Sequence, residues 1–427
     1  MPLEYFGVNT YGAGDIKHAS AVRAGDWVFA TGLRATDARG LIDPAVIGEN
    51  RPLDPPPRPQ REAALIFKKA GEFLTAAGSS LAHVARVDQY YPHWSAVDPY
   101  HVARKQALGE AVPPSTSILV SRLLNLDAQM DVQMMAATAG SGRKPERITV
   151  RDVGAPTESG YATCTQVGDF IFVAGQLARD ESGAIAAAAK VPDGQLWKGT
   201  RIKRETDYLI KHRLMPALTA GGSSFDLILK AQVYLSRVED FPAFWQVWSA
   251  AFKGKVAPTL IVPVRHPGFG TEEATIEVNI IAAKASAASR VRDIDCDIDL
   301  IGPNMLAARA FDGLLFVAGL MGIDRNGLVP GARGDATAPF YHCPAHAQMA
   351  DILHKARTIF AAAGSDLGHV VRALHFHRDL GDFHNAHRAW ADVVGDGPLP
   401  FTAIEVDDRL FVPGTSVIVD LWGALPD

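Results

Sequence analysis

The sequence predicts an α/β (α+β) protein built from three successive units of the order β-β-α-β-α-β-β. Three features each occur three times along the chain: a strand that ends in glycine, a glycine that ends a long helix, and an aspartate before a second helix. Their copies are separated by 142 to 144 residues. Because a fixed long period is the signature of a repeated structural unit, three units of similar fold are expected.

The most distinctive feature is an apolar run that ends at a glycine, found at residues 28–33, 171–177 and 315–320. Runs of β-branched and aromatic residues closing on glycine are typical of a buried strand that ends at a bend. We expect each run to be the second strand of a hairpin. The hairpins are predicted at residues 20–33, at residues 164–177 and in the stretch that ends at residue 320.

Two helices are expected after each hairpin. The first has apolar residues at helical spacing and ends at a glycine, which readily takes the left-handed conformation that closes a helix. The second follows an aspartate that is suited to cap a helix N-terminus. The first helices are predicted at residues 62–77, 201–220 and 345–363, and the second helices at residues 99–109, 241–252 and 383–393. The helix-ending glycines are Gly78, Gly222 and Gly364, and the aspartates are Asp98, Asp240 and Asp382.

Three further strands complete each unit. One lies between the two helices, at residues 84–91, 229–235 and 370–376. Two close the unit, at residues 115–123 and 128–138, then 260–264 and 274–282, then 402–406 and 415–422. The expected domains are residues 1–142, 147–285 and 298–427, with linkers near residues 143–150 and 286–297, where the residues are polar, charged or small.

The predicted strands are apolar on both faces. One face of each sheet is covered by its own two helices. The other face would be exposed in an isolated unit, but three similar units can bury it by packing around a common axis, as the subunits of a symmetric trimer do. We therefore expect an intramolecular pseudo-trimeric barrel, present as a monomer or as a homo-oligomer of it.

Composition excludes several classes of function. The net charge of −5 over 427 residues argues against a general nucleic-acid binder. The three cysteines, Cys164, Cys296 and Cys343, are scattered, as expected in a reducing compartment without a disulfide framework. The first residues lack the pattern of a signal peptide, and no apolar run approaches the ~20 residues that cross a bilayer. A cytoplasmic protein without membrane or nucleic-acid partners is expected.

The repeated pattern resembles the Rid family, also called YjgF-type reactive intermediate deaminases. The resemblance covers nearly the whole chain three times and is strongest in the middle unit, at Phe172-Val173-Ala174-Gly175-Gln176-Leu177, Val233-Tyr234-Leu235 and Asp240-Phe241. It implies chorismate-mutase-like units with ligand clefts between neighbours. It also implies hydrolysis of imines or enamines of small metabolites, without a metal or a cofactor.

The chain departs from this family at four positions. The arginine that holds the substrate carboxylate is replaced in all three units, by Ser115, Thr259 and Phe401. An aromatic hydroxyl that opens the hairpin is kept only as Tyr161, against His18 and Met305. An acidic residue on the last strand is kept only as Asp420, against Gln133 and Asn279. A polar residue on the second helix corresponds to Ala103, Trp245 and His387.

The resulting hypothesis is a Rid-like hydrolase or deaminase that acts on a C–N bond of a small polar metabolite at a cleft between units. Asp420 and His387 are the expected proton-transfer residues. The substrate-binding candidates are Tyr161, Arg179, Ser115 and Gln176, the residue that follows the middle glycine.

Three alternatives remain open at this point. The histidines of the third unit, among them His375, His377 and His384, share faces of a strand or a helix and are candidates for a metal site. Ser115 with a lysine such as Lys105 is the basis of the second alternative. Serine–lysine pairs open cyclic amides in the similar threefold architecture of cyanuric acid hydrolase and barbiturase, although the chain carries no sequence motif of that family. A non-catalytic metabolite-binding protein is the third alternative, because the family arginine is missing from every unit.

Overall fold

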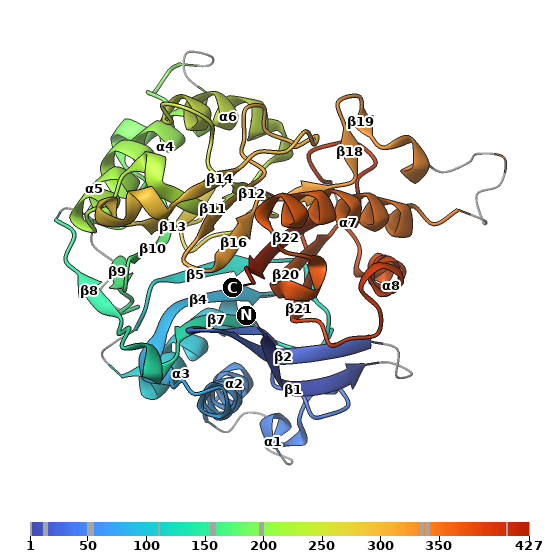
Figure 1. Ribbon diagram of the computed structural model, residues 1–427. Helices are drawn as coiled ribbons and strands as arrows, with labels where there is room; N and C mark the ends of the chain where they lie inside the picture. The colour runs from blue at the N-terminus through green and yellow to red at the C-terminus, as the bar shows by residue number, and fades with distance from the viewer. Residues whose placement is uncertain are drawn as a thin grey trace.

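The computed structural model describes residues 2–11, 16–48, 55–109, 112–151, 153, 159–195, 200–333, 337, 342–406 and 409–426. Three mixed β-sheets lie around the centre of the molecule, and the longer helices lie outside them (Figure 1). The expected mixed α/β class is confirmed. Each sheet is open, with none closed on itself in the described part of the chain.

The first sheet runs from an N-terminal hairpin to the strand after the second helix. Its strand order is β1 (Leu3–Tyr11), β2 (Ile16–Ala24), β3 (Trp27–Leu33), β7 (Asp131–Ala137), β4 (Val84–Tyr91) and β5 (Ser115–Leu119). Only β4 and β5 are parallel; the other neighbours are antiparallel.

The second sheet has the same order of corresponding strands. It comprises β8 (Glu146–Ile148), β9 (Cys164–Val167), β10 (Phe170–Gln176), β13 (Ile276–Ala283), β11 (Ile228–Leu235) and β12 (Thr259–Pro263). Here too the single parallel pair is the last one, β11 with β12.

The third sheet follows this order again and gains one strand from the first part of the chain. It comprises β14 (Arg292–Ile294), β15 (Ala308–Phe311), β16 (Leu314–Val317), β22 (Val417–Ala424), β20 (Val370–His377), β21 (Phe401–Glu405) and β6 (Arg122–Leu123). The short β17 (Leu320–Met321) also pairs with β22, and β18 (Ile323–Asp324) pairs with β19 (Gly327–Leu328).

Two of these strands lie where the sequence predicts linkers. β8 and β14 lie in the stretches 143–150 and 286–297, where each pairs with the edge of the following hairpin. Their charged, largely exposed residues resemble a loop in sequence, yet such residues are common on edge strands, where they discourage pairing with other chains.

The helices flank the sheets in three groups. They are α1 (Pro44–Ile47), α2 (Arg58–Ala76) and α3 (Val97–Leu108), then α4 (Arg201–Leu209), α5 (Met215–Ala220) and α6 (Phe241–Ala250), then α7 (Pro344–Ala363) and α8 (Phe383–Val394). None of the described helices combines the length and apolar character needed to cross a bilayer.

Two helix predictions need correction. The helix expected over residues 201–220 is interrupted by the π-helical turn η5 (Ile210–Leu214). Pro216 follows this turn and has no N–H to donate, so the wider turn fits the chain where a regular helix would lose a hydrogen bond. Asp98 lies inside the first turn of α3, whereas Asp240 and Asp382 precede α6 and α8, so the three aspartates are not equivalent.

The inner faces of the three sheets share one apolar core. Trp27 of the first sheet contacts Phe170 of the second at 5.1 Å between ring centroids, and Phe170 contacts Phe311 of the third at 4.9 Å. Trp422 of the third sheet closes the ring of contacts with Phe29 of the first at 6.2 Å. Buried aromatic pairs of this kind add edge-to-face attraction to the loss of apolar surface from water, so each sheet covers a face of the other two.

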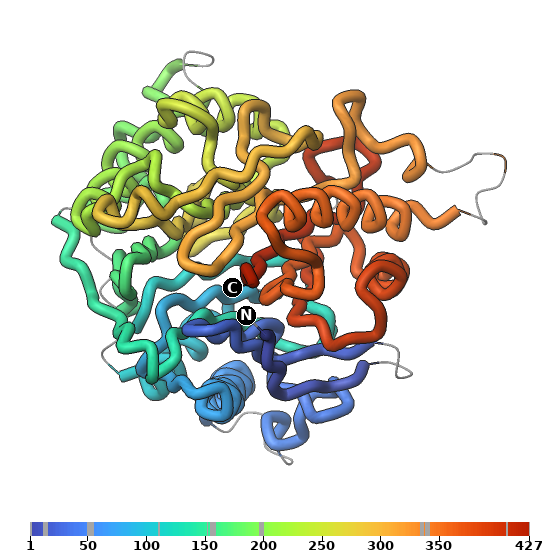
Figure 2. The backbone as a smooth tube through the Cα atoms, viewed as in Figure 1, coloured from blue at the N-terminus to red at the C-terminus, as the bar shows by residue number. Residues whose placement is uncertain are grey.

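Neighbouring sheets meet at three junctions, which are visible in Figure 2 as the places where differently coloured parts of the chain adjoin. We number them by the sheets they join: the first junction joins sheets one and two, the second joins two and three, and the third joins three and one. Corresponding backbone hydrogen bonds cross them, from Ala162 N to Val112 O (2.9 Å), Leu306 N to Val256 O (2.9 Å) and Ala19 N to Leu399 O (3.1 Å). The junctions therefore have one backbone design and differ in their side chains.

Candidate functional site

The first junction contains a pocket of about 320 Å³ that is lined by polar and charged side chains. One wall comes from α3 and β5 of the first sheet, and the other from β10, β13 and the residues around them in the second. Its polar and charged lining includes His101, Arg104, Ser115, Tyr161, Arg179 and Glu277. Three of them, Tyr161, Arg179 and Ser115, are substrate-binding residues expected from the sequence, and the fold brings them to one pocket.

Helix α3 supplies a guanidinium to this pocket. Arg104 is fully buried, and its guanidinium donates to Ser115 Oγ at 2.9 Å and to Ser159 O at 2.6 Å. Its Nε has no hydrogen-bond partner in the described part of the chain. In the alignment expected from the sequence, Ser115 takes the place of the Rid-family arginine, and Arg104 would then supply a guanidinium beside that position.

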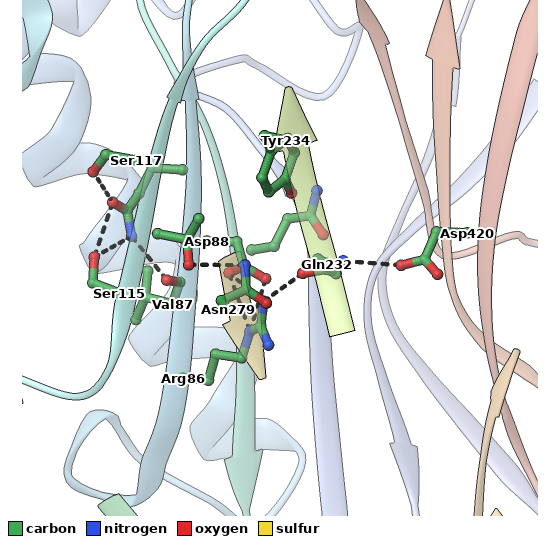
Figure 3. A network of polar contacts seen from close by, with 12 residues as sticks. Arg86, Val87, Asp88, Ser115, Ser117, Gln232, Tyr234, Asn279 and Asp420 are labelled. Carbon is green, nitrogen blue, oxygen red and sulfur yellow. Dashed lines mark hydrogen bonds and ion pairs between the residues drawn. The ribbon is translucent and has the colours of Figure 1, made fainter. Parts of the chain in front are cut away.

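The Ser115 hydroxyl is fully engaged with its neighbours. It accepts from Arg104 and from Gln89 Nε2 at 2.8 Å, and it donates to Gln89 Oε1 at 3.1 Å. The Ser117 hydroxyl donates to the same Gln89 oxygen at 2.8 Å (Figure 3). A nucleophilic serine needs a base to take its proton. Here the proton goes to a neutral amide oxygen, which suits Ser115 to orienting and binding.

The opposite wall carries a carboxyl group whose acidity is strongly altered. Glu277 lies on β13 and is 5 % exposed. Burial raises the pKa of Glu277 to about 8, against the opposing effect of Arg179; the buried Asp88 adds to the increase. At neutral pH this carboxyl group is mostly protonated, so it can donate a proton to a ligand and take one back.

Gly175, at the end of β10, makes room for this carboxyl group. A Cβ at this position would overlap Glu277 Oε1 and would come within 3.3 Å of Thr116 Oγ1. The need for glycine here comes from close approach, since the backbone is not left-handed as it is at Gly32. The repeated glycine thus has a function in the second sheet that goes beyond ending a strand.

Tyr161 lies between the charged groups of the two walls. Burial raises the pKa of its hydroxyl, and the positive charges of Arg179, Arg213 and Arg104 act against that increase. Arg213 is on the π-helical turn η5, and its Nε donates to Gln176 Oε1 at 3.1 Å. The pocket therefore lies in a region of positive potential, which favours an anionic ligand.

The side chain of Gln176 does not line the pocket, although the sequence predicts that it binds the substrate. Its side chain is 1 % exposed, accepts from Arg213 and donates to Ala174 O at 3.2 Å. It is not among the residues that line the pocket. Gln176 positions Arg213 behind the wall, and direct contact with a ligand stays a prediction for Tyr161, Arg179 and Ser115.

Asp420 lies in a buried polar network at the centre of the molecule. Its carboxylate contacts Lys230 Nζ at 2.6 Å and Arg372 at 3.0 Å, and accepts from Gln232 Nε2 at 3.0 Å. Figure 3 shows it at one end of this network, with Arg86 towards the other. It is not among the lining residues of the first-junction pocket, and it pairs with two buried cations, of which Arg372 is also paired with Asp88.

His387 lies in a different pocket, between α8 and the start of β2. Its neighbours there include Lys17, His384 and Arg388. Burial lowers the pKa of His387 to about 4, so its ring is neutral at neutral pH. Asp420 and His387, expected to work together, are therefore in separate environments.

The histidines of β20 are packed against aromatic rings. His375 stacks on Phe401 at 6.1 Å and lies 6.0 Å from the His377 ring, and both histidines are fully buried. Burial lowers the pKa of His377 to about 4 despite the nearby Asp379. In the described part of the chain, no group of three or more histidine, cysteine or acidic side chains is arranged to hold a metal ion.

The third junction contains a buried charged pair of its own. Asp131 occupies the register position of Glu277, opposite Tyr90 as Glu277 is opposite Tyr234. It pairs with Arg34 at 2.8 Å and accepts from Thr402 Oγ1 at 2.6 Å, with both charged side chains fully buried. The two charges compensate each other, and Arg34 also lines a pocket of about 190 Å³ together with Tyr11 and Lys69.

The second junction is filled by tryptophans. Trp248 donates from Nε1 to Thr259 Oγ1 at 3.3 Å, the same relation that joins Arg104 to Ser115. Trp245 packs so closely that a Cβ on Gly302 would overlap its ring. Ile418 takes the register position of Glu277. This junction is apolar where the first is charged.

Sequence reasoning missed Glu277, Arg104 and His101. The sequence pattern assigns the acidic position of the last strand to Asn279, two residues along, and Asn279 instead donates to Thr116 Oγ1 at 3.0 Å in the central network. The available signal was a lone carboxyl group between Ile276 and Val278, in a strand whose one other polar residue is Asn279. Arg104 gave no local signal, because a charged residue near the end of a helix is usually solvated.

Comparisons with known proteins match the central part of the chain to a family. The family model described as endoribonuclease L-PSP matches residues 154–284, which hold most of the second sheet and its helices. A RutC family protein of Pyrococcus abyssi is 32 % identical over 125 residues, covering 29 % of this chain and 86 % of that protein. The crystal structure of RidA from an Antarctic Psychrobacter matches with a TM-score of 0.26 and 20 % identity, over 32 % of this chain and 98 % of that one.

A longer match is the crystal structure of a chorismatase. It covers 80 % of this chain and 93 % of that one, at 13 % identity and a TM-score of 0.49. The sequence relationship is carried by the RutC family protein, most of whose length is matched at above 30 % identity. The chain therefore belongs to the RutC family of endoribonuclease L-PSP, or Rid, proteins.

Proposed function

We propose that the chain consists of three divergent Rid-like units, residues 1–142, 147–285 and 298–427, arranged as an intramolecular pseudo-trimer. The common strand order of the three sheets supports this proposal, as do the corresponding backbone hydrogen bonds across the junctions. The molecule acts as a monomer or as a homo-oligomer of the pseudo-trimer. On this view the three junctions are three versions of one ancestral cleft, and the first combines a carboxyl group and two arginines in one pocket.

The proposed activity is hydrolysis of the C–N bond of a small imine or enamine in the pocket of the first junction. The observation that carries the proposal is the position of Glu277, a carboxyl group with a pKa of about 8 that shares a pocket with Arg104 and Arg179. Two guanidinium groups can hold an anionic substrate, and a carboxyl group that titrates near neutral pH can transfer protons to and from its reacting atoms.

The reaction needs only water and proton transfers. Protonated Glu277 gives its proton to the imine nitrogen, and the resulting carboxylate takes a proton from the water that adds to the carbon. Glu277 then protonates the amino group of the carbinolamine. As the C–N bond breaks, Glu277 recovers a proton from the hydroxyl group of the carbinolamine. The products are ammonia and a carbonyl compound, and Glu277 returns to its initial state.

The other pocket residues bind and orient the substrate. Arg104, with Ser115 and Ser117 beside it, holds the carboxylate next to the C–N bond. Tyr161 donates a hydrogen bond across the pocket, and Arg179 contributes a second positive charge. Asp420 and His387 keep the neighbouring structure in place and are not assigned to proton transfer.

A cyclic-amide hydrolase is the weaker alternative, because the Ser115 hydroxyl is already engaged by Gln89 and Arg104. Non-catalytic binding of an anionic metabolite is the stronger one, since the same arginines favour it without any reaction. A measurement of ammonia release distinguishes non-catalytic binding from catalysis.

The test is ammonia release from imines generated in the assay by an amino-acid oxidase, and from freshly formed 2-aminoacrylate. We expect release faster than in buffer, with kcat/KM constant up to about pH 8 and falling above it as Glu277 loses its proton. An unchanged rate for every imine, with tight binding of the corresponding carboxylates, would establish the binding protein instead.

A further inference from the structure

The pocket of the first junction contains two arginines without an acidic partner. Within the described part of the chain, neither Arg104 nor Arg179 lies within 4.0 Å of a carboxylate, whereas Arg34 in the third junction is paired with Asp131. Arg104 is fully buried with an unpartnered Nε, and Arg179 also has an Nε that is buried and unpartnered. Arg104 is a buried guanidinium group and Arg179 a half-buried one, and buried donors without partners cost free energy unless an anion meets them.

The two arginines come from different walls. Arg104 is on α3 of the first sheet and is fixed by Ser115 and Ser159. Arg179 follows β10 of the second sheet, where its backbone pairs with Ile185 and its guanidinium approaches Gly270. The positive charges of both Arg104 and Arg179 act on the pKa of Tyr161. A ligand with anionic groups at two places can satisfy both guanidinium groups.

The other titratable groups of the pocket do not compensate the positive charges of Arg104 and Arg179. His101 beside Arg104 is neutral, because burial and the charges of Arg104 and Lys105 lower its pKa to about 3. Glu277 is mostly protonated at neutral pH because of its burial. Asp98 lies at the exposed rim of the pocket. The interior of the pocket thus keeps an excess of positive charge in the absence of a ligand.

We infer that the first-junction pocket recognises a small dianion, in which Arg104 binds the carboxylate beside the C–N bond and Arg179 binds a second anionic group. The inference rests on the proposed function in placing the reacting bond beside Glu277. The substrate class is the imine of an amino dicarboxylic acid, with a phosphorylated imino acid as the other source of a second anion.

The experiment compares imines generated in the assay from alanine and from aspartate, which differ by one carboxylate. We expect kcat/KM to be about 10- to 100-fold higher for the aspartate-derived imine, the contribution of one charge-assisted bidentate contact. In Arg179→Met this ratio falls to within about twofold, whereas Arg104→Met lowers kcat/KM for both imines. The control Arg388→Met removes an exposed arginine of α8 and keeps the wild-type ratio.

Binding of stable ligands separates this inference from the proposed activity. Calorimetry on the wild-type protein with succinate, phosphoglycolate and propionate needs no turnover and no variant that must fold. Tighter binding of either dianion than of propionate supports the inference, and the better of the two identifies the second anion. Equal binding of all three, or equal loss for both imines in Arg179→Met, overturns it. Absence of turnover with preserved dianion binding refutes the proposed reaction alone.

Discussion

Glu277 Oε1 occupies the space that a Cβ on Gly175 would need. The two residues lie on β10 and β13, which are adjacent strands of the second sheet. The glycine that marks the repeated pattern in the sequence is therefore also the residue that admits a carboxyl group to the pocket. At the corresponding positions, Gly32 has a left-handed backbone and Gly319 packs against Leu260, so the same residue type serves different purposes.

Gly175→Ala should displace the Glu277 side chain and lower kcat/KM by about 10²-fold or more, because general acid–base catalysis contributes about 10²- to 10⁴-fold. The measurement is ammonia release from an imine at pH 7, together with a thermal melt that confirms folding. The matched control is Gly254→Ala, which changes a glycine with open space around it and no left-handed backbone. A Gly175→Ala enzyme as active as this control would show that the position of the carboxyl group is unimportant.

Ser115→Ala should retain catalysis at a reduced level, within about tenfold of the wild type, because the change removes one hydrogen bond to Arg104 and leaves its guanidinium present. A serine nucleophile would instead lose nearly all activity, a factor of about 10⁶ where it has been measured in a hydrolase. Single-turnover ammonia release distinguishes the two. Loss on the larger scale would favour the cyclic-amide hydrolase mechanism.

Asp420→Asn should destabilise the protein while sparing the chemistry. The change leaves Lys230 and Arg372 without their shared carboxylate in a fully buried site, which costs about 3–5 kcal/mol of the free energy of unfolding. Asp169→Asn is the control, because the exposed pair of Asp169 with Arg290 contributes less than about 1 kcal/mol. Urea unfolding measures both. If Asp420→Asn were as stable as the control but inactive, Asp420 would have to be reassigned to catalysis.

Stability should fall below pH 6.5, and buried histidines are one cause. His18, His377 and His387 have pKa values lowered by burial to about 3, 4 and 4, so in the folded protein they are neutral at pH 5, whereas in the unfolded chain they bind protons below pH 6.5. Where the unfolded state binds more protons, the free energy of unfolding decreases as the pH falls. The window is pH 6.5 down to about 4.

His377→Leu should reduce this pH dependence. The substitution removes a buried ring whose two nitrogens have no partner in the described part of the chain. Urea unfolding at pH 7.0 and pH 5.0 gives the slope, with His354→Leu, at an exposed position of α7, as the control. A slope equal to that of the control would mean that His377 is not neutral when buried.

Much of the fold could be read from the sequence, because its signals are local. Hairpins ending in glycine, amphipathic helices and closing strands each leave a pattern within a few residues, and these elements lie near their predicted places. The strands β1, β8 and β14 were missed because edge strands have weak patterns and are recognised only through their partners. The π-helical turn η5 was missed because the helical spacing of apolar residues runs through it.

The candidate site could be predicted from the sequence only in part, because its contacts join residues on different helices and strands. Tyr161, Arg179 and Ser115 follow from positions in a repeated pattern, and the fold places all three at one pocket. Arg104 takes part through a contact with Ser115 across two elements, and Glu277 through an approach to Gly175 between strands. Such relations depend on register, and an assignment shifted by two residues selects Asn279, which faces the centre of the molecule.

The central claim is that Glu277 transfers protons during hydrolysis of a C–N bond. Its most direct test is the rate of ammonia release from an aspartate-derived imine by wild-type protein and by Glu277→Gln, which keeps the size of the side chain and removes its titration. We predict that wild-type protein accelerates release over buffer and that Glu277→Gln lowers kcat/KM by about 10²- to 10⁴-fold while remaining folded. A Glu277→Gln protein as fast as the wild type, with the same dependence on pH, would contradict the account.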